Sequence, residues 1–338
     1  MLPEPLQFTG LSFPDLAGLL ESEARARTAL RWLYNAGLPA TLPDRVPGVA
    51  SAVWDRLREK CRLPEWRLLS EQRGRDGTVK LAIDFAGRSV ETVLIPGPRR
   101  STVCLSSQSG CTRRCSFCAT ARLGYGGNLT AAEIVAQYVL ARKLAPPGCP
   151  ARNVVFMGMG EPMDNLDAVL QAVAVLTRSP YPALSPAHVT VSTTGVVPGI
   201  ERFLRESDAC LALSLNATTD AVRRRLMPHA RTWPLARVLE SIRQHCCRRE
   251  VFVEYLLLAG INDTPADAER LPRLLDGLPV RVNLIPFNGF PHSGFRPPDE
   301  ERILDFRKTL TGAGLRCIIR RPRGDDIAAA CGQLASAG

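Results

Sequence analysis

The sequence predicts an α/β fold, a partial barrel of six βα units preceded by a small helical domain and a β-hairpin. Three observations predict it. Strand-like and helix-like runs alternate from about residue 101 onward, helical spacing fills most of the first 70 residues, and two strand-like runs around a Gly-containing turn lie between. Repeated βα units build a parallel sheet with right-handed crossovers. The chain is therefore divided into residues 1–75, 76–100, 101–321 and 322–338.

The first segment is expected to be helical. Residues 15–37 carry apolar residues at helical spacing and end on Asn-Ala-Gly, a helix stop signal. A second helix is expected over 47–61. Strands are expected over 78–85 and 89–96, and the turn between them contains Gly87, which is typical of a hairpin.

The barrel elements follow from the same alternation. Its strands are expected at 102–108, 153–160, 188–195, 209–216, 250–260 and 280–288. Its helices are expected at 130–144, 165–178, 199–207, 234–248 and 267–278, followed by a helix at 299–311 and a strand at 315–321. Polar residues gather where these strands end, which is where barrel active sites lie.

Composition and charge exclude several classes of protein. Hydrophobic residues make up 45% and charged residues 22% of the 338 residues, as in ordinary globular proteins. No apolar run is long enough to span a membrane, and the N-terminus lacks a secretion signal. We therefore expect a cytoplasmic protein with no membrane partner. The net charge of +10 favours a polyanionic partner such as nucleic acid, and charge solvated on the surface is the alternative.

Eleven cysteines indicate metal or redox chemistry, because a disulfide framework suits short secreted chains and this chain is long with an odd count. Cys111, Cys115 and Cys118 form a C-x3-C-x2-C pattern on a predicted loop after the first barrel strand. Thiolates suit iron–sulfur clusters or zinc. Zinc needs a fourth ligand, which no second C-x2-C pair supplies. A four-iron cluster on three cysteines leaves one iron free for a non-protein ligand.

This pattern, with the aromatic Phe117 before the last cysteine, resembles the radical S-adenosylmethionine (SAM) superfamily. The resemblance implies a 4Fe-4S cluster held by Cys111, Cys115 and Cys118, with SAM chelating the fourth iron. One electron from the cluster then cleaves the sulfonium of SAM and yields a 5′-deoxyadenosyl radical. The cofactors supply this chemistry, while the protein orients them and excludes water. Three cysteines that bind no metal are the alternative.

Five stretches in order, from about residue 85 to the end, resemble the RlmN/Cfr family. They are VCLSSQSGCTRRCSFCAT, VVFMGMGEPMDN, VTVSTTGVVPGI, NLIPFN and RGDDIAAACGQL. Members of that family methylate an adenine of 23S ribosomal RNA at C2 or C8, and some C2 enzymes also methylate a tRNA. The RGDD lead-in favours C2. Methylation at C8 and a non-catalytic iron–sulfur RNA-binding protein are the alternatives.

The resemblance implies three catalytic residues. Cys331 matches the family's methyl carrier, which takes a methyl group from one SAM before the radical from a second SAM activates it for addition to the adenine. Cys104 matches the thiol that breaks the enzyme–RNA adduct by forming a disulfide. Glu91 matches the base that removes the ring proton. The alternatives are two buried structural cysteines and an exposed hairpin glutamate.

The resemblance also implies SAM-contacting residues at the strand ends: Gly160, Glu161, Ser192, Ser214, Leu215, Asn216 and Asn288. Gly160 allows close backbone approach, and Glu161 can accept from the ammonium group of SAM. Ser and Asn at strand ends are otherwise common turn formers. The chain departs from the family at Asn216, where His is usual, and at Gly127, where Arg is common. These departures point to a divergent paralogue with a different RNA target.

RNA is the expected macromolecular partner. The target adenine is expected to be presented outside its base stack, and the surplus of basic residues is expected to contact the RNA backbone. Candidate phosphate contacts are Arg223, Arg224, Arg225, Arg320, Arg321 and Arg323. A solvated helix face is the alternative for the first three. The helical domain, residues 1–75, is expected to add an RNA-binding surface. The family further implies an electron donor such as flavodoxin or ferredoxin, and we expect a monomer.

Overall fold

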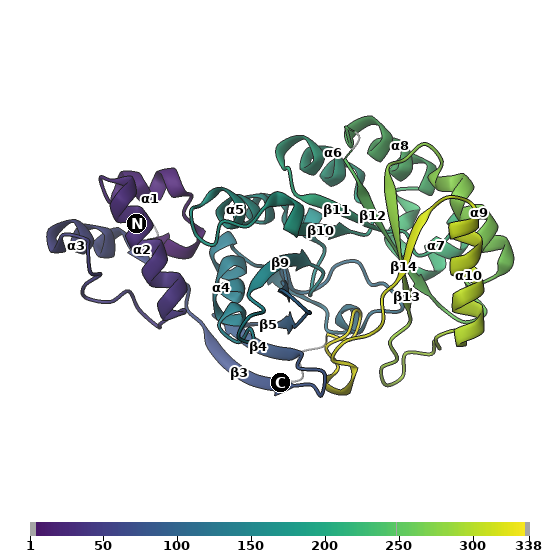
Figure 1. Cartoon of the computed structure of the whole chain (residues 1–338), viewed down its shortest axis with the longest axis horizontal. Coiled ribbons are helices and arrows are strands. Elements are labelled where there is room, and N and C mark those ends of the chain that lie inside the picture. The colour runs from purple at the N-terminus through teal and green to yellow at the C-terminus, as the bar shows by residue number, and fades with distance from the viewer. Residues whose placement is uncertain (1–4, 248, 335–338) are drawn as a thin grey trace.

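The predicted α/β fold is confirmed by the computed structural model of the chain, which describes residues 5–247 and 249–334. A helical domain lies beside a large open sheet, and helices cover the outer face of that sheet (Figure 1). The predicted first and last segments extend into residues 1–4 and 335–338, and one predicted helix ends at residue 248. Those positions lie outside the described residues.

The helical domain begins with a short strand and a 3-10 turn at Phe8–Gly10. Its elements are β1 (Leu6–Gln7), α1 (Phe13–Leu19), α2 (Glu23–Ala36), α3 (Ser51–Lys60) and β2 (Cys61–Arg62), with β1 parallel to β2. Ser12 and Ser22 cap α1 and α2, since each side chain accepts from a backbone N–H of the first turn. Helix α2 ends at Gly37, whose φ of 87° an L side chain rarely adopts.

Trp54 is the centre of the core of this domain. Its side chain is fully buried, and its indole N–H donates to the carbonyl of Pro43 at 2.8 Å. Phe8 and Trp32 approach its ring edge-on, each with a centroid separation of 6.2 Å. Aromatic rings of this size dominate the energetics of a small core, so the domain depends on this one side chain.

The hairpin predicted from the sequence has a third strand. Strands β3 (Arg67–Arg73), β4 (Val79–Phe85) and β5 (Arg88–Ile95) are antiparallel neighbours, and β5 pairs antiparallel with the first barrel strand. The hairpin is therefore part of the barrel sheet. Strand β3 was not predicted because every residue in it is exposed, so it has no alternation of apolar and polar residues to detect.

The barrel strands follow in chain order, each parallel to the next. They are β6 (Ser101–Cys104), β9 (Ala151–Phe156), β10 (Val189–Thr193), β11 (Cys210–Ser214), β12 (Val251–Leu257), β13 (Val280–Pro286) and β14 (Arg316–Ile319). In the described residues the sheet has ten strands, with β3 at one edge and β14 at the other, so the barrel is open. All of the predicted barrel strands are confirmed, with shorter bounds.

The helices between the strands also match the predicted order, except that the short helix Asp220–Leu226 was not predicted. They are α4 (Ala131–Arg142), α5 (Leu166–Arg178), α6 (Val197–Glu206), α7 (Asp220–Leu226), α8 (Leu235–His245), α9 (Pro265–Leu275) and α10 (Glu300–Gly312). Helix α4 begins with a capping box, in which the side chains of Thr130 and Glu133 each accept from the backbone N–H of the other. A small antiparallel pair, β7 (Gln108–Gly110) and β8 (Tyr125–Asn128), flanks the three-cysteine loop.

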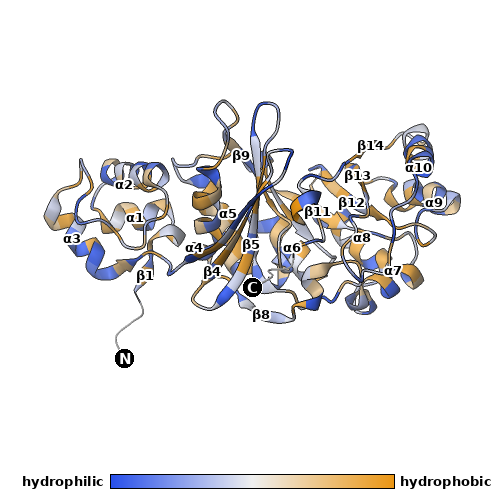
Figure 2. Ribbon diagram, turned by 90° about the horizontal axis from the view of Figure 1, so that it is seen from below, coloured by the Kyte–Doolittle hydropathy of each residue, from blue (hydrophilic) through white to orange (hydrophobic). Residues whose placement is uncertain are grey.

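Short 3-10 turns complete the fold at Ala119–Arg122, Pro162–Asn165, Pro186–His188, Pro228–Arg231 and Asp325–Ile327. The barrel strands are apolar along most of their length because both of their faces are covered. Figure 2 shows these hydrophobic strands surrounded by helices, and the outer faces of the helices are hydrophilic. In the described part of the chain, no helix is long and apolar enough to cross a membrane.

We predict that Trp54→Ala destabilises the helical domain by about 3–5 kcal/mol, because it removes the largest buried side chain of that core. Urea unfolding followed by tryptophan fluorescence and circular dichroism measures the change. Leu69→Ala is the matched control, since Leu69 is 40% exposed on β3. Equal effects of the two substitutions would contradict the assigned role of Trp54.

Candidate functional site

The carboxyl ends of the barrel strands open into one cavity. Its lining residues include Cys111, Cys115, Cys118, Gly160, Glu161, Ser192, Ser214, Asn216, Glu254 and Cys331. A second cavity beside it is lined by Cys104, Asn288, Arg320 and Cys331, among others. The structure thus brings most of the predicted site residues together, and Cys331 lines both cavities.

The three clustered cysteines lie on the loop between β7 and β8. The backbone N–H of Cys111 donates to the carbonyl of Gly124 at 3.1 Å, and that of Cys118 donates to the carbonyl of Cys115 at 3.1 Å. Burial, together with a smaller contribution from neighbouring thiols, raises the pKa of the Cys111 thiol to about 12 and that of Cys115 well above its usual value. Three thiolates held this close need a cationic partner.

These thiols suit an iron–sulfur cluster with three protein ligands. The donors are soft, they line one cavity, and their mutual repulsion is relieved only by a cation. In the described residues, no three Cys, His, Asp or Glu side chains already form a metal-binding group. Cluster binding would therefore draw the thiols of this loop together.

Gly160 lies where β9 ends and the chain turns toward the cavity. Its φ is 101°, and a Cβ atom placed on it would lie 2.6 Å from Cβ of Gln108. No other residue fits at this position without displacing Gln108, whose side-chain carbonyl accepts from the backbone N–H of Glu161 at 2.9 Å. The structure shows that the backbone at Gly160 closely approaches Gln108, while the predicted approach to SAM stays a prediction.

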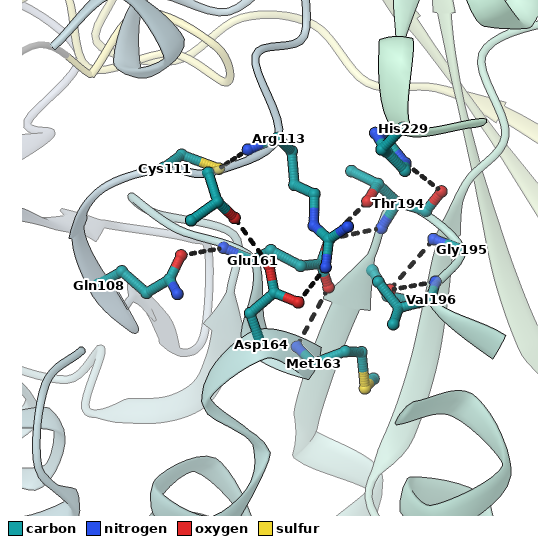
Figure 3. Close-up of polar contacts among 12 residues, drawn as sticks. Gln108, Cys111, Arg113, Glu161, Met163, Asp164, Thr194, Gly195, Val196 and His229 are labelled. Atoms are coloured by element: carbon teal, nitrogen blue, oxygen red, sulfur yellow. Dashed lines mark hydrogen bonds and ion pairs between the residues drawn. The ribbon is translucent and has the colours of Figure 1, made fainter. Parts of the chain in front are cut away.

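The Glu161 carboxylate joins the ends of two strands (Figure 3). It accepts from the backbone N–H of Met163 at 3.1 Å, and from the N–H and hydroxyl of Thr194 at 2.8 and 2.6 Å. Burial raises the pKa of this carboxyl, and the hydrogen bonds from Thr194 and Met163 oppose that rise. A buried carboxylate on the cavity wall favours a cationic ligand.

His229 and Arg113 lie close to this network (Figure 3). A ring nitrogen of His229 lies 3.2 Å from the carbonyl oxygen of Thr194. Burial lowers the pKa of His229 to about 4, so the ring is neutral near pH 7. Arg113 forms an ion pair with Asp164, which fixes the cysteine loop to the turn after Glu161.

Two serines and an asparagine line the opposite wall of the cavity. The hydroxyl oxygens of Ser192 and Ser214 lie 3.3 Å apart across β10 and β11. Asn216 has a φ of 56°, in the left-handed region that Asn enters more readily than most residues. Its side-chain carbonyl accepts from the backbone N–H of Leu256 at 2.9 Å. The residue that replaces the usual His therefore ties the end of β11 to β12.

Leu215 does not line either cavity. Its side chain is fully buried in the core, while its carbonyl accepts from Arg223 and its N–H donates to the carbonyl of Glu254. Any contact of Leu215 with a ligand would have to involve its backbone. Asn288 lies in the second cavity, where its side-chain N–H donates to the carbonyl of Cys331 at 3.2 Å.

Cys104 and Cys331 both line the second cavity. Burial, with a smaller contribution from the thiol of Cys331, raises the pKa of Cys104 to about 12. Cys331 is accessible because it faces open space, yet it lies deep enough that burial raises its pKa as well. Arg320 opposes both shifts, because its positive charge favours either thiolate.

Glu91 is buried, so the alternative of an exposed hairpin residue is wrong. Its Oε1 atom lies 3.1 Å from Nζ of Lys80, which is also buried. Residue Val93 pairs with Cys104 between β5 and β6. Because side chains alternate along a strand, Glu91 lies on the same face of the sheet as Val93 and Cys104.

Two buried charges of the site were not among the predicted residues. Glu254 lines the first cavity, where its Oε1 accepts from the side chain of Asn283 at 2.7 Å and lies 3.8 Å from Arg320. Its Oε2 has no hydrogen-bond partner among the described residues. The sequence signal that could have identified Glu254 was a glutamate inside the apolar strand VFVEYLL. A charged residue is rarely buried in a parallel strand unless it has a partner or a function. Lys80 likewise interrupts an apolar strand.

The predicted phosphate contacts need correction. Arg223 is fully buried and donates to the carbonyls of Leu215 and Trp233, so it cannot contact a phosphate in this structure. It was misassigned because it lies on the inner side of the short helix α7. The other arginines of the C-terminal set form ion pairs within the chain, namely Arg320 with Glu254, Arg321 with Glu300 and Arg323 with Asp76.

Gly127, where the family commonly has Arg, adopts a φ of 126°. An L side chain rarely adopts this backbone conformation, so an arginine there would require a different loop. Gly127 lies within β8, the strand that follows the cysteine loop.

An open βα barrel with three cysteines on the loop after its first strand defines the class of radical SAM proteins. The model of the Radical SAM superfamily matches residues 105–271. A crystal structure of a radical SAM methyltransferase from Sphaerobacter thermophilus matches with a TM-score of 0.91 and 37% identity, covering 98% of this chain and all of that one.

Curated relatives define the family more closely. The dual-specificity RNA methyltransferase RlmN of Anaeromyxobacter sp. strain Fw109-5 is 44% identical over 332 residues, covering 96% of this chain and 88% of that protein. RlmN of Halorhodospira halophila is 40% identical over 338 residues, covering 98% and 93%. The chain belongs to the RlmN family of the radical SAM superfamily, as the sequence motifs indicated.

We predict that Gly160→Ala weakens SAM binding at least about tenfold, because the added Cβ displaces Gln108 and with it the backbone of Glu161. Equilibrium dialysis with labelled SAM on the anaerobically reconstituted protein measures the change. Gly312→Ala is the control, since a Cβ there meets nothing within 4 Å. Unchanged SAM affinity in the Gly160 variant would show that the cavity does not depend on this turn.

Proposed function

We propose that this protein is a radical SAM methyltransferase that adds a methyl group to C2 of an adenine in RNA, in 23S rRNA, tRNA or both. One observation carries the proposal. Cys331 lines both the cavity that contains the three clustered cysteines and the cavity that contains Cys104. A single thiol at this position can receive a methyl group on one side and meet a second thiol on the other.

Cys111, Cys115 and Cys118 would hold a 4Fe-4S cluster, and SAM would fill the cavity above them. When bound, the cluster supplies the electron that cleaves SAM to a 5′-deoxyadenosyl radical. Ser192, Ser214 and the buried Glu161 line the cavity and would orient SAM, whose ammonium and sulfonium groups are cationic. The unpartnered Oε2 of Glu254 offers a further acceptor for the same ligand. The apolar lining from Phe156, Leu256 and Ile285 would exclude water.

Cys331 would act as the methyl carrier. Its thiolate would take the methyl group of one SAM by displacement, and a second SAM would then be used to activate that methyl group. The first transfer requires the thiolate. Arg320 lies by both thiols and is held there by Glu254 at 3.8 Å, so its charge favours the thiolate of Cys331.

Cys104 and Glu91 would complete the reaction from the opposite wall. The thiolate of Cys104 would attack Sγ of Cys331 and form a disulfide, breaking the bond from that sulfur to the new methyl carbon. The electron pair of the broken bond returns to the carbon, which is then protonated. Before the disulfide forms, the activated methyl carbon would bond to adenine C2. Glu91, on the same face of the sheet as Cys104, would take the C2 proton, and the remaining unpaired electron would pass to the bound cluster. Nζ of Lys80 lies 3.1 Å from Oε1 of Glu91.

The helical domain and the partners of the enzyme belong to the same proposal. The domain stands beside the barrel, and we assign it to RNA binding because of this position (Figure 1). A small electron carrier, flavodoxin or ferredoxin, would reduce the cluster. We place the enzyme in the cytoplasm as a monomer.

Labelled methyl transfer tests the proposal. Anaerobically reconstituted protein, methyl-labelled SAM and total RNA from cells that lack the gene should give labelled 2-methyladenosine in digested RNA, detected by mass spectrometry. Cys331→Ala should lower this product at least about a hundredfold, because the carrier is gone.

Cys317→Ala is the matched control, since Cys317 is a buried thiol of β14. Labelled 8-methyladenosine would move the reaction to C8. No labelled nucleoside from an enzyme that still cleaves SAM would contradict RNA methylation of these targets.

Removal of the helical domain tests its role. A chain that starts at residue 61 retains β3 and β4, which belong to the barrel sheet, so we expect SAM cleavage to persist within about twofold while RNA affinity falls at least about tenfold. Filter binding at 50 and 200 mM salt measures the loss. Equal RNA affinity of the truncated and full chains would contradict the assignment.

A further inference from the structure

The segment that carries Cys331 is fixed to the sheet at a hairpin turn, through Arg323, which also lines the second cavity. After β14 the chain returns to the turn between β3 and β4, residues Gly74–Thr78 (Figure 1). Nε of Arg323 lies 2.5 Å from Oδ2 of Asp76, and the same guanidinium donates to the carbonyls of Asp76 and Pro96 at 3.1 Å. These hydrogen bonds thus attach the first residues of the segment to the turn.

Hydrogen bonds to the turn continue at the next residues of the segment. The backbone N–H of Gly324 donates to Oδ2 of Asp76 at 3.1 Å, and the backbone N–H of Arg75 donates to Oδ2 of Asp326 at 2.9 Å. Gly324 has a φ of 64°, and a Cβ on it would lie 2.7 Å from the side chain of Thr78. Only glycine allows this close approach of segment and turn.

The far end of the segment is held by the barrel. The carbonyl of Gly332 accepts from the backbone N–H of Ala119 at 2.8 Å, on the loop that carries the clustered cysteines. The side chain of Gln333 donates to the carbonyl of Gly289 at 2.8 Å. Cys331 therefore lies between two anchors, one on the hairpin and one at the cavities.

We propose that Asp76 is a positioning residue for Cys331, and that its contacts with Arg323 and Gly324 fix the reach of the carrier thiol into both cavities. This inference rests on the proposed function, in which Cys331 carries the methyl group. Asp76 itself lines neither cavity, and it acts on Cys331 through the segment that begins with its partner Arg323, a residue on the wall of the second cavity. The three contacts of its carboxylate, with Arg323, Gly324 and Thr78, are hereafter called the Asp76 clasp.

The negative charge of the Asp76 carboxylate maintains the Asp76 clasp. Partial burial raises the pKa of Asp76, but the hydrogen bonds from Arg323, Thr78 and Gly324 outweigh it and lower the pKa to about 2. The carboxylate is therefore charged at every pH at which the protein works. The clasp is a constant constraint, and its strength does not vary with pH in that range.

Geometry explains why the constraint matters. Eight peptide units separate Arg323 from Cys331 in the sequence, so an unanchored segment could carry the thiol over roughly 26–29 Å when extended. The clasp and the barrel anchor reduce this range to one position shared by two cavities. Displacement of a reacting atom by about 1 Å can cost about a hundredfold in rate.

Asp76→Ala tests the inference, with the first methyl transfer as the readout. Reconstituted protein is mixed with SAM and no RNA, and the methylated fraction of Cys331 is followed in time by mass spectrometry. We expect the rate to fall at least about tenfold, while the dissociation constant of SAM changes less than about twofold, because the clasp does not touch that cavity. Asp76→Asn should fall between the alanine variant and the parent protein.

Asp84→Ala is the matched control, since Asp84 accepts from Gly87 in the turn at the other end of β4. Its rate should equal that of the parent protein. A transfer rate unchanged in Asp76→Ala would overturn the inference. So would a parallel loss of SAM binding and melting temperature, which would mean that Asp76 only stabilises the fold. A parent protein that never methylates Cys331 would instead overturn the proposed function.

Discussion

The site depends on one buried carboxylate. Glu161 accepts three hydrogen bonds, from Met163 and from the N–H and hydroxyl of Thr194, and these join the end of β9 to the end of β10. A buried carboxylate is costly without such partners. Once Glu161 is satisfied, the turn at Gly160 and the side chain of Gln108 have only one arrangement. The neighbouring cysteine loop is then placed by the ion pair of Arg113 with Asp164, three residues further on.

The carboxyl ends of the barrel strands all contribute residues to the site, because a parallel sheet directs these ends to one edge. This is why the sequence order of the site residues was enough to predict that they lie together. Gly160, Glu161, Ser192, Ser214 and Asn216 follow successive strands, and all five line one cavity. Tertiary packing then determines whether a residue presents its side chain or only its backbone to the cavity. The side chain of Leu215, for example, lies in the core.

Other parts of the fold and site could not be predicted, for physical reasons that differ. Strand β3 is exposed on both faces, so its sequence has no period of two. Arg223 is buried because three backbone carbonyls accept its guanidinium, and such acceptors exist only after folding. Glu254 could have been suspected from its apolar strand. Its proximity to Arg320 depends on the registers of β12 with β13 and of β13 with β14, which a single sequence does not specify.

The edge of the sheet at β3 has a consequence for the molecule as a whole. An unpaired edge strand is a template for another strand and invites aggregation. Here the edge carries Arg67, Glu71 and Arg73, and its register with β4 shifts between Leu68 and Ser70. Charges and a bulge both discourage docking of a second strand. The exposed Leu68 and Leu69 therefore lie on an edge whose charges and bulge oppose pairing with a second strand.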